Sequence, residues 1–379
     1  MRVFAAAVAV GVANAVVFVA FEWVVNDGTD WVWNDLADSD AERWRVVPLA
    51  IAGSIVLSIV MRLTGQRRIV PASTDPLAGG PAASVPVVLL IGAVSLLAGA
   101  SLGPEASLVA AATGMGAWFA SEKRLVLASL GALLVAFLGS LVAMAIPLVL
   151  LYRRAGRLPF ALVVPIVVAG LTAYGTLRLF GSDGFGKVPA STDLRVRDFV
   201  LAFVLGGFGV LAAAALKAGQ ARLTGVGAAI DARLHWTVSA AVFGAVLGLL
   251  YLVGGQTVEF SGSAGSSLVA KEHLGTFALL GLVVVKLAAT AWSLATGDRG
   301  GLVFPSIYVG VAFSLALGDL AGPGATIGAI SGILAALTEP ALGVVMLVGL
   351  LPLKLVVLGV LGTAGAIVAQ RATASRSSA

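Results

Sequence analysis

Long apolar segments separated by short polar stretches follow one another along the whole chain. Runs of this length with few charges are typical of helices that cross a membrane. We expect membrane segments at residues 3–25, 46–63, 84–100, 104–119, 125–151, 159–180, 199–216, 236–254, 276–295, 301–318, 324–337 and 340–369. The pattern predicts an all-α polytopic membrane protein. Several segments are short or contain glycine and proline, which predicts broken, tilted helices that are buried among other helices.

The segment Gly99–Leu108 places a carboxylate and a Gly-Pro pair inside an apolar run. Proline suits the first position of a helix, because the N–H that it lacks would have no partner there. A helix that begins inside a membrane points its free N–H groups and positive dipole end at its surroundings, which favours an anion. Glycine and proline punctuate Gly300–Pro305 in the same way. We therefore expect helices to begin at Gly103-Pro104 and at Gly301–Pro305, with N-termini that face one another.

Composition supports the membrane class. Of the 379 residues, 59% are hydrophobic and 11% are charged, and the mean hydropathy is +1.03. A soluble protein could not bury so much apolar surface. The run at 3–25 is long enough to span a bilayer, so we expect an uncleaved first span rather than a signal peptide. With no cysteine, two histidines and no phosphate-binding loop, we expect no metal, no cofactor, no nucleotide and no nucleic acid.

Charged residues gather between the apolar segments, and their sign changes along the chain. Residues 25–45 form an acidic stretch that we expect to be a loop. Basic residues cluster in later stretches, which we also interpret as loops and the tail: Arg62, Arg67, Arg68, Arg153, Arg154, Arg157, Lys217, Arg222, Arg233, Arg371 and Arg376. The positive-inside rule then places the basic stretches and both termini in the cytoplasm and the acidic loop outside, in a cell (plasma) membrane.

Three short segments carry recognisable motifs, in the order Ala72-Ser73-Thr74-Asp75-Pro76, Ala100-Ser101-Leu102-Gly103-Pro104 and Gly300-Gly301-Leu302-Val303-Phe304-Pro305. They resemble, in turn, the G-S-G-I-P, G-[KR]-E-G-P and G-G-x-F-x-P motifs of the CLC family of chloride channels and chloride/proton antiporters. The third match is the most specific and the first is degraded. Their order and spacing make the chain similar to a divergent, prokaryotic-type member of that family.

The resemblance implies an architecture. Members of the family consist of two inverted-topology halves whose helix N-termini converge on an anion path, and they form homodimers with one path per subunit. For this chain it implies a first half at 1–180, a polar linker at 181–198, a second half at 199–370 and a short cytoplasmic tail at 371–379. The polar tail is expected to be disordered.

The resemblance also implies the residues of the anion path, which are Ser73, Leu102, Gly103, Pro104, Glu105, Gly301, Leu302, Val303 and Phe304. Ser73 corresponds to the serine that coordinates the central anion, and Val303 to the pore phenylalanine. The family's gating glutamate falls at Leu102, its inner proton-relay glutamate at Tyr152 and its pore tyrosine at Pro352. Both carboxylates that a coupled exchanger needs are therefore absent from their usual places.

Glu105 has two interpretations, which the sequence leaves open. It is either a first-turn carboxylate that complements its helix dipole, or a displaced gate that competes with anions when ionised and retreats when protonated. For Lys286, Phe304 and Tyr308 a structural role is favoured. His235 adjoins Trp236 and is expected to belong to an interfacial belt.

The favoured function is passive, channel-like transport of a small inorganic anion, chloride above all, across a lipid bilayer. The alternatives are a proton-coupled anion exchanger that uses Glu105 and a non-conducting structural or sensory relative. An intramembrane enzyme is disfavoured, because no nucleophile or acid–base cluster with motif spacing is found in the sequence. We therefore expect no catalytic residues.

Overall fold

The computed structural model describes residues 2–34, 40–69, 84–119, 123–185, 188, 191–338, 343–344, 347 and 349–377. These residues are mainly helical, and Gly103 and Gly301 form an isolated antiparallel bridge. The helices of eleven residues or more are α1 (Arg2–Thr29), α3 (Val46–Leu63), α4 (Val85–Leu97), α5 (Glu105–Phe119), α6 (Lys123–Leu138), α7 (Ala145–Ala155), α8 (Phe160–Leu179), α9 (Val196–Arg233), α10 (Trp236–Gly254), α12 (Thr276–Ala295), α13 (Val303–Ala316), α14 (Pro323–Leu337) and α16 (Val356–Ser377). A short helix, α11 (Ser263–Val269), lies between α10 and α12.

Among the described residues, seven helical segments are long and apolar enough to cross a membrane. This confirms the predicted all-α polytopic membrane class. The shorter apolar helices α13 and α14 are enclosed by their neighbours, since nearly all of their side chains are buried. Broken helices of this kind can lie at membrane depth only where protein surrounds them, as the sequence pattern predicted.

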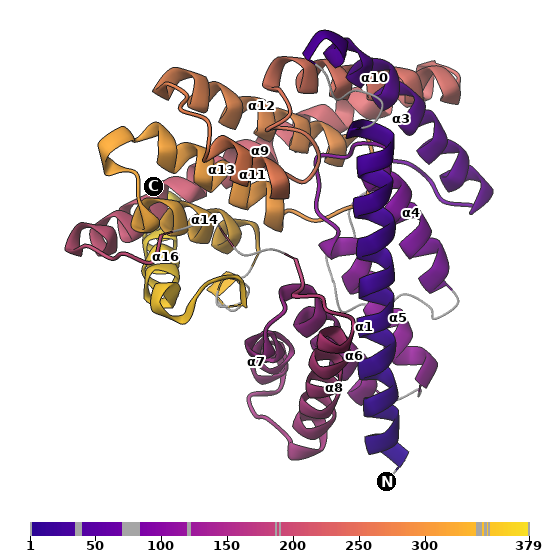
Figure 1. Ribbon diagram of the computed structural model, residues 1–379, viewed down its shortest axis with the longest axis vertical. Coiled ribbons are helices and arrows are strands. Elements are labelled where there is room, and N and C mark those ends of the chain that lie inside the picture. Colours follow the sequence, from indigo (N-terminus) through magenta and orange to yellow (C-terminus); the bar gives the residue numbers. More distant parts are fainter. Residues whose placement is uncertain are drawn as a thin grey trace.

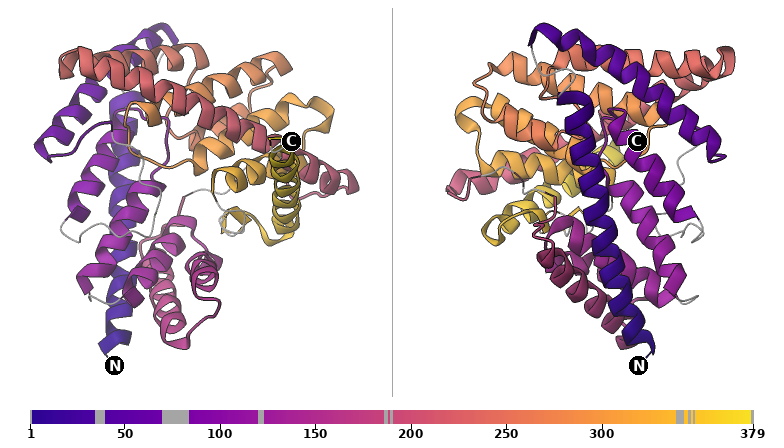
Figure 2. Two further views of the ribbon diagram at one scale, coloured as in Figure 1. Left: turned by 180° about the vertical axis from the view of Figure 1, so that it is seen from behind. Right: turned by 45° about the vertical axis from the view of Figure 1, so that its right-hand side comes forward.

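Most of the helices form two groups. Helix α1 packs along α4, α5, α6 and α8, and α9 packs on α12, α14 and α16 (Figure 1). Figure 2 shows α1 extending past the first group from other directions. In that group the buried Asn14 donates a hydrogen bond to Ser129 of α6 at 2.8 Å, and Ser129 donates to the carbonyl of Ala112 in α5 at 2.6 Å. Helix α3 lies beside α10.

Glycines allow the helices of the second group to approach one another closely. A Cβ atom added to Gly206 of α9 would overlap the carbonyl of Gly362 in α16, and one added to Gly332 of α14 would overlap the carbonyl of Gly206. Small residues at such crossings bring helix backbones into contact, which stabilises helix packing in lipid.

Several predicted boundaries are wrong. The segment expected at 125–151 is two helices, α6 and α7, separated by Gly139 in the left-handed region at φ 60°. A Cβ there would overlap the carbonyl of Asp183, so the chain turns where only glycine fits. The acidic stretch is also only partly a loop, because α1 continues to Thr29 and the chain is helical again at 30–34 and 40–45.

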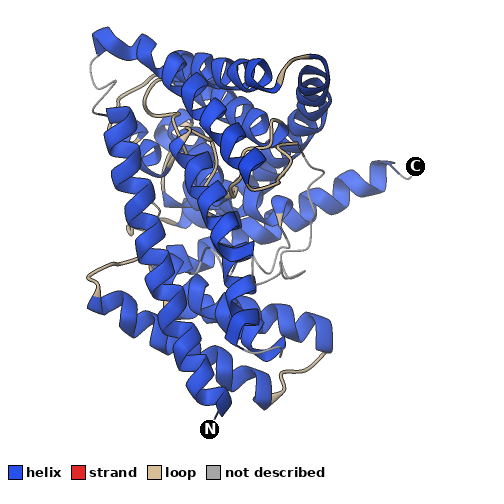
Figure 3. Cartoon of the chain, turned by 90° about the vertical axis from the view of Figure 1, so that its right-hand side faces the viewer, coloured by secondary structure: helices blue, strands red, loops and turns tan. Residues whose placement is uncertain are grey.

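The basic stretch after residue 216 is not a loop, since α9 runs on through Lys217 and Arg222 to Arg233. Its first turn takes up the last residues of the expected linker, where Asp198 accepts a hydrogen bond from the N–H of Arg195 at 2.7 Å. The tail is helical rather than disordered as far as Ser377, because α16 continues past Gln370. Figure 3 shows this C-terminal end standing away from the other helices. Alanine, lysine, glutamine and arginine all favour helix, which explains why polarity alone misplaced these ends.

Candidate functional site

Two helices begin where the sequence predicted them, and their starts are joined. Helix α5 begins directly after Gly103-Pro104, and α13 begins two residues after Gly301. Between them, the N–H of Gly103 donates to the carbonyl of Gly301 at 2.9 Å, and the N–H of Gly301 donates to the carbonyl of Gly103 at 2.6 Å. The N-terminal ends of α5 and α13 are thereby held against one another, which confirms that they face each other.

The side chain of Glu105 lies at the N-terminus of α13. Its Oε1 accepts a hydrogen bond from the backbone N–H of Phe304 at 3.3 Å. Glu105 is 6% exposed, and among the described residues its Oε2 has no hydrogen-bond partner. Gly103 and Gly301 leave room for the carboxylate, because a Cβ on either would overlap it. A negative group therefore occupies the positive end of the α13 dipole, where the free N–H groups of a helix bind anions.

Hydroxyl groups hold the loop before α5 in place. The N–H of Ser101 donates to Oγ of Ser293 at 3.0 Å, and its hydroxyl lies 3.1 Å from that of Thr290. Tyr251 of α10 donates to the carbonyl of Gly99 at 2.5 Å. These contacts satisfy backbone groups that would otherwise be buried without partners, so they fix the start of α5 relative to α10 and α12.

The residues at the start of α13 contribute backbone rather than side chains to the contact with Glu105. The ring of Phe304 lies against Phe137 at 5.9 Å and Phe185 at 5.3 Å between ring centroids. Val303 is buried, and Leu302 is half-buried. Phe304 therefore packs in an aromatic cluster, while its N–H faces the Glu105 carboxylate.

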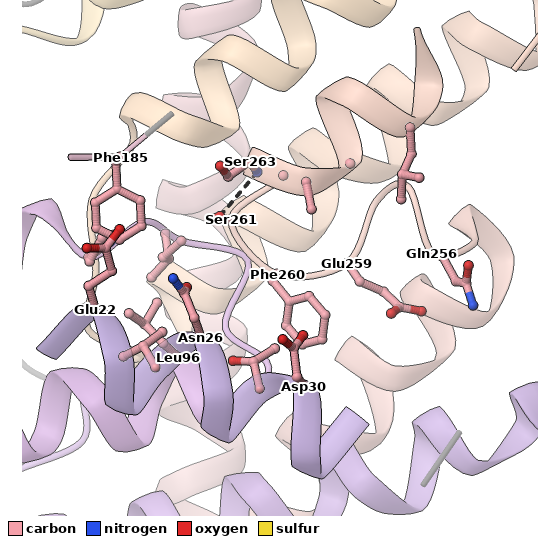
Figure 4. Close-up of a pocket in the computed structure, with 18 residues that line it drawn as sticks. Glu22, Asn26, Asp30, Leu96, Phe185, Gln256, Glu259, Phe260, Ser261 and Ser263 are labelled. Atoms are coloured by element: carbon pink, nitrogen blue, oxygen red, sulfur yellow. Dashed lines mark hydrogen bonds between the residues drawn. The ribbon is translucent and has the colours of Figure 1, made fainter. Parts of the chain in front are cut away.

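A cavity of about 620 Å³ lies beside the start of α5 (Figure 4). Leu102 and Pro104, within three residues of Glu105, line its wall. Figure 4 shows Glu22 and Asn26 projecting from α1, across the cavity from Ser261 and Ser263, where α11 begins. Other residues of the wall are Asp30, Gln256 and Glu259. The cavity, here called the vestibule, therefore borders the residues that precede α5.

The vestibule wall contains charged residues that the sequence reasoning did not single out. Burial raises the pKa of Glu259, in the loop after α10, to about 7, although Arg43 and Lys286 act to lower it. Lys286 of α12 is fully buried and donates to the carbonyls of Val258 at 2.9 Å and Phe260 at 2.5 Å. These two hydrogen bonds from Lys286 hold the loop around Glu259 against α12. A lone glutamate between Val258 and Phe260 was the sequence signal that could have indicated this wall.

An ion pair joins the loop after α3 to the loop after α12, which leads to Gly301. Arg68 contacts Asp298 at 3.2 Å, with 8% of each side chain exposed. The guanidinium also donates to the carbonyl of Thr296 at 2.9 Å and to that of Ser54 at 2.8 Å. No spacing in the sequence could have paired Arg68 with Asp298, since the two belong to loops that only the fold brings together.

Four other residues singled out in the sequence lie in the described part of the chain. Ser73 and the motif around it lie outside the described residues. Tyr152, in α7, is 56% exposed, and Pro352 lies just before α16. His235 is exposed and directly precedes α10, with its ring 5.6 Å from that of Trp236. Tyr308 is buried beneath Lys286 and donates to Thr257 at 3.2 Å, consistent with packing.

The fold and the site together define a class: an all-helical membrane protein in which two broken helices meet at their N-termini beside a cavity. The chain belongs to the voltage-gated chloride channel (CLC) family, which matches residues 44–371. Its members are transporters that move anions through membranes. Among individual relatives, the chain is 27% identical over 332 residues to YfeO of Escherichia coli O139:H28, a candidate ion-transport protein. The match covers 82% of this chain and 78% of that protein.

Solved structures have the same fold. A slow cyanobacterial Cl⁻/H⁺ antiporter superposes with a TM-score of 0.76 at 18% identity, covering 98% of this chain and 95% of the other. A CLC-type fluoride/proton antiporter superposes with a TM-score of 0.75 at 16% identity, covering 96% and 94%. A eukaryotic CLC transporter gives a TM-score of 0.70 at 14% identity, covering 98% of this chain and 72% of the other. At these identities the likeness concerns the fold.

Proposed function

We propose that this protein transports a small inorganic anion, chloride above all, by a passive, channel-like mechanism. The observation that carries the proposal is the position of the Glu105 carboxylate. An anionic group is already held by the N–H of Phe304 at the start of α13, so the same place suits a mobile anion. The proposed path runs through the vestibule past Leu102 and Pro104 to this helix end.

The path would bind its ion without a full positive charge. Backbone N–H groups at the start of α13, such as that of Phe304, would replace part of the hydration shell of the ion, and Ser73 would add a hydroxyl donor. Binding through partial charges is strong enough to admit an ion and weak enough to release it, as conduction requires. No enzymatic activity and no resident cofactor belong to this proposal.

Passive transport is favoured over exchange by two side chains. Leu102 and Tyr152 occupy the places where the resemblance puts the two carboxylates of coupled members. Neither side chain is a carboxylate. The two carboxylates that coupled members use are therefore absent from both places.

Proteoliposomes test this difference. An imposed chloride gradient is expected to drive chloride flux accompanied by few or no protons, because neither Leu102 nor Tyr152 supplies a carboxylate. Chloride efflux and internal pH are measured together, and fluoride and nitrate replace chloride in parallel runs. Liposomes without protein supply the background. Stoichiometric, uphill proton movement would contradict passive transport, and absence of any anion flux would favour the non-conducting relative.

A second candidate is a proton-coupled anion exchanger that uses Glu105 alone. It is favoured by one observation, namely that Oε2 of Glu105 is buried without a partner among the described residues. An unsatisfied buried carboxylate oxygen has a high free-energy cost when charged, which favours a group that changes its protonation state or its position. Two of the solved structures with the same fold are proton-coupled antiporters, which is consistent with it.

We further propose that the chain forms two inverted halves at 1–180 and 199–370, assembles as a homodimer and lies in the plasma membrane with both termini in the cytoplasm. The distribution of charged residues supports the orientation. The chain contains no cysteine, so single introduced cysteines can report on sidedness.

Labelling with a membrane-impermeant maleimide tests the orientation. Trp31, at the end of α1, is 69% exposed, and Arg157, between α7 and α8, is also exposed. Trp31→Cys is expected to react in intact cells, whereas Arg157→Cys should react only after permeabilisation. The cysteine-free parent chain is the control. The reverse pattern would invert the proposed topology.

A further inference from the structure

A second cavity, of about 520 Å³, lies where the end of α3 meets the start of α10. It is separate from the vestibule and does not touch Glu105. Its polar wall includes Arg62, Arg67, Arg68 and Asp231, and Trp236 closes one side. We refer to it as the arginine pocket.

The arginine pocket has an excess of positive charge. Arg68 is compensated by Asp298 at 3.2 Å, and Asp231 is the other acidic residue of the wall. Arg62 and Arg67 are exposed, and no ion pair involving either is found among the described residues. The guanidinium of Arg62 lies over the ring of Trp236, 4.8 Å from its centroid. Three arginines against Asp231 and Asp298 leave the pocket suited to an anionic group.

The pocket is also amphipathic and lies at the ends of membrane spans. Met61, Ile69 and Phe243 form the apolar part of its wall. Arg62 stands at the end of the span Arg43–Leu63, and Trp236 begins the span Trp236–Gly254. Tryptophan and arginine at span ends are typical of the membrane interface. A free inorganic anion would use only the arginines, whereas a lipid would use both parts of the wall.

We propose that the arginine pocket binds the phosphate headgroup of an anionic membrane lipid such as phosphatidylglycerol. The phosphate lies against Arg62 and Arg67, and the glycerol and upper acyl chains lie against the half-buried Ile69 and Trp236. Basic pockets between membrane helices are suited to such headgroups, because each arginine near the surface adds attraction for a phosphate.

The pocket is connected to the loop that carries Gly301. Arg68 in its wall donates to the carbonyl of Thr296 at 2.9 Å, and Arg299 donates from Nη2 to the carbonyl of Arg67 at 3.1 Å. Residues 296–299 lead directly to Gly301 and the start of α13. A lipid bound at Arg67 therefore restrains residues 296–299 and, through them, the start of α13 at the proposed anion site. This second effect rests on the proposed function, whereas the binding itself does not.

Lipid titration of the detergent-purified full chain tests the binding. Bound dioctanoyl phosphatidylglycerol is counted by native mass spectrometry, and the midpoint of thermal unfolding is followed in parallel. Each of Arg62→Gln and Arg67→Gln is expected to weaken binding about fivefold. Arg157→Gln removes the same charge from an exposed loop outside the pocket and is expected to leave binding unchanged. Without lipid, Arg67→Gln and Arg157→Gln should unfold at the wild-type temperature, because both side chains are exposed; Arg62→Gln also loses the contact with Trp236, so it is judged by the count of bound lipid.

The competing outcomes separate the sources of phosphate. Phosphatidylcholine, which has no net charge, should bind at least fivefold more weakly than phosphatidylglycerol. Inorganic phosphate that protects the protein at the same concentration as the lipid would overturn a lipid site in favour of a soluble phosphate. Equal binding of phosphatidylglycerol to wild type and both pocket variants would also overturn it. If binding depends on the arginines but no anion flux is detected in liposomes, the lipid site stands and the proposed function fails.

Discussion

Glu105→Gln is expected to raise anion flux at pH 7.5 by about tenfold, which corresponds to a barrier lower by roughly 1.4 kcal/mol. In the wild type, the Glu105 carboxylate accepts from the N–H of Phe304, which is the proposed anion position. Protonation removes the charge that competes with the anion, so wild-type flux should rise as the pH falls. Glutamine carries no charge at any pH, so the variant should conduct at a constant high level.

Anion efflux from proteoliposomes between about pH 4.5 and 8, a range that spans usual and perturbed glutamate titration, provides the measurement. Glu272→Gln is the matched control, because Glu272 is exposed in the loop before α12 and lies outside the vestibule wall. If Glu105 only complements the dipole of α5, the variant loses roughly 0.3–1 kcal/mol of stability and its pH profile matches the wild type. Superimposable profiles would rule out the gate.

Gly301→Ala is expected to produce the same pH-independent flux by a steric route. The added Cβ would overlap Oε2 of Glu105, and the atoms nearest to it all belong to that side chain. Gly301 does not have a positive φ, so the alanine backbone is unstrained and the carboxylate is the group that must move. Once displaced from the N–H of Phe304, it no longer competes with the anion.

The efflux assay checks this prediction together with the double variant Gly301→Ala/Glu105→Gln. Both substitutions act on one carboxylate, so their effects should not add. Gly275→Ala is the control, since a Cβ there has no neighbour within 4 Å. A Cβ on Gly103, which precedes α5, would also overlap the Glu105 carboxylate. Gly103→Ala should therefore reproduce the effect if Gly301→Ala fails to fold. Wild-type pH dependence in both folded alanine variants would contradict the gate.

Local chemistry explains which elements could be predicted from the chain alone. Proline after glycine favours the first turn of a helix, and α5 and α14 begin at such pairs, while α13 begins within the glycine- and proline-containing segment Gly300–Pro305. The apolar runs alone also placed α3, α10 and α12 correctly, whereas the ends of α1, α9 and α16, which continue into polar sequence, were misplaced. The turn at Gly139 was missed, because its glycine is required by a carbonyl from Asp183 rather than by neighbours in sequence.

The sequence by itself determined that this protein lies in a membrane, that helices break at Gly-Pro signals within apolar runs, and that its motifs are those of the CLC family. These properties depend on composition and on residues a few positions apart. Only the tertiary structure decided that Glu105 lies against Phe304, 199 residues away, and that Arg68 pairs with Asp298. Such contacts depend on how helices pack and on which glycines let backbones meet, which no local pattern encodes. The arrangement of the charged residues near the proposed anion site is therefore determined by the tertiary structure.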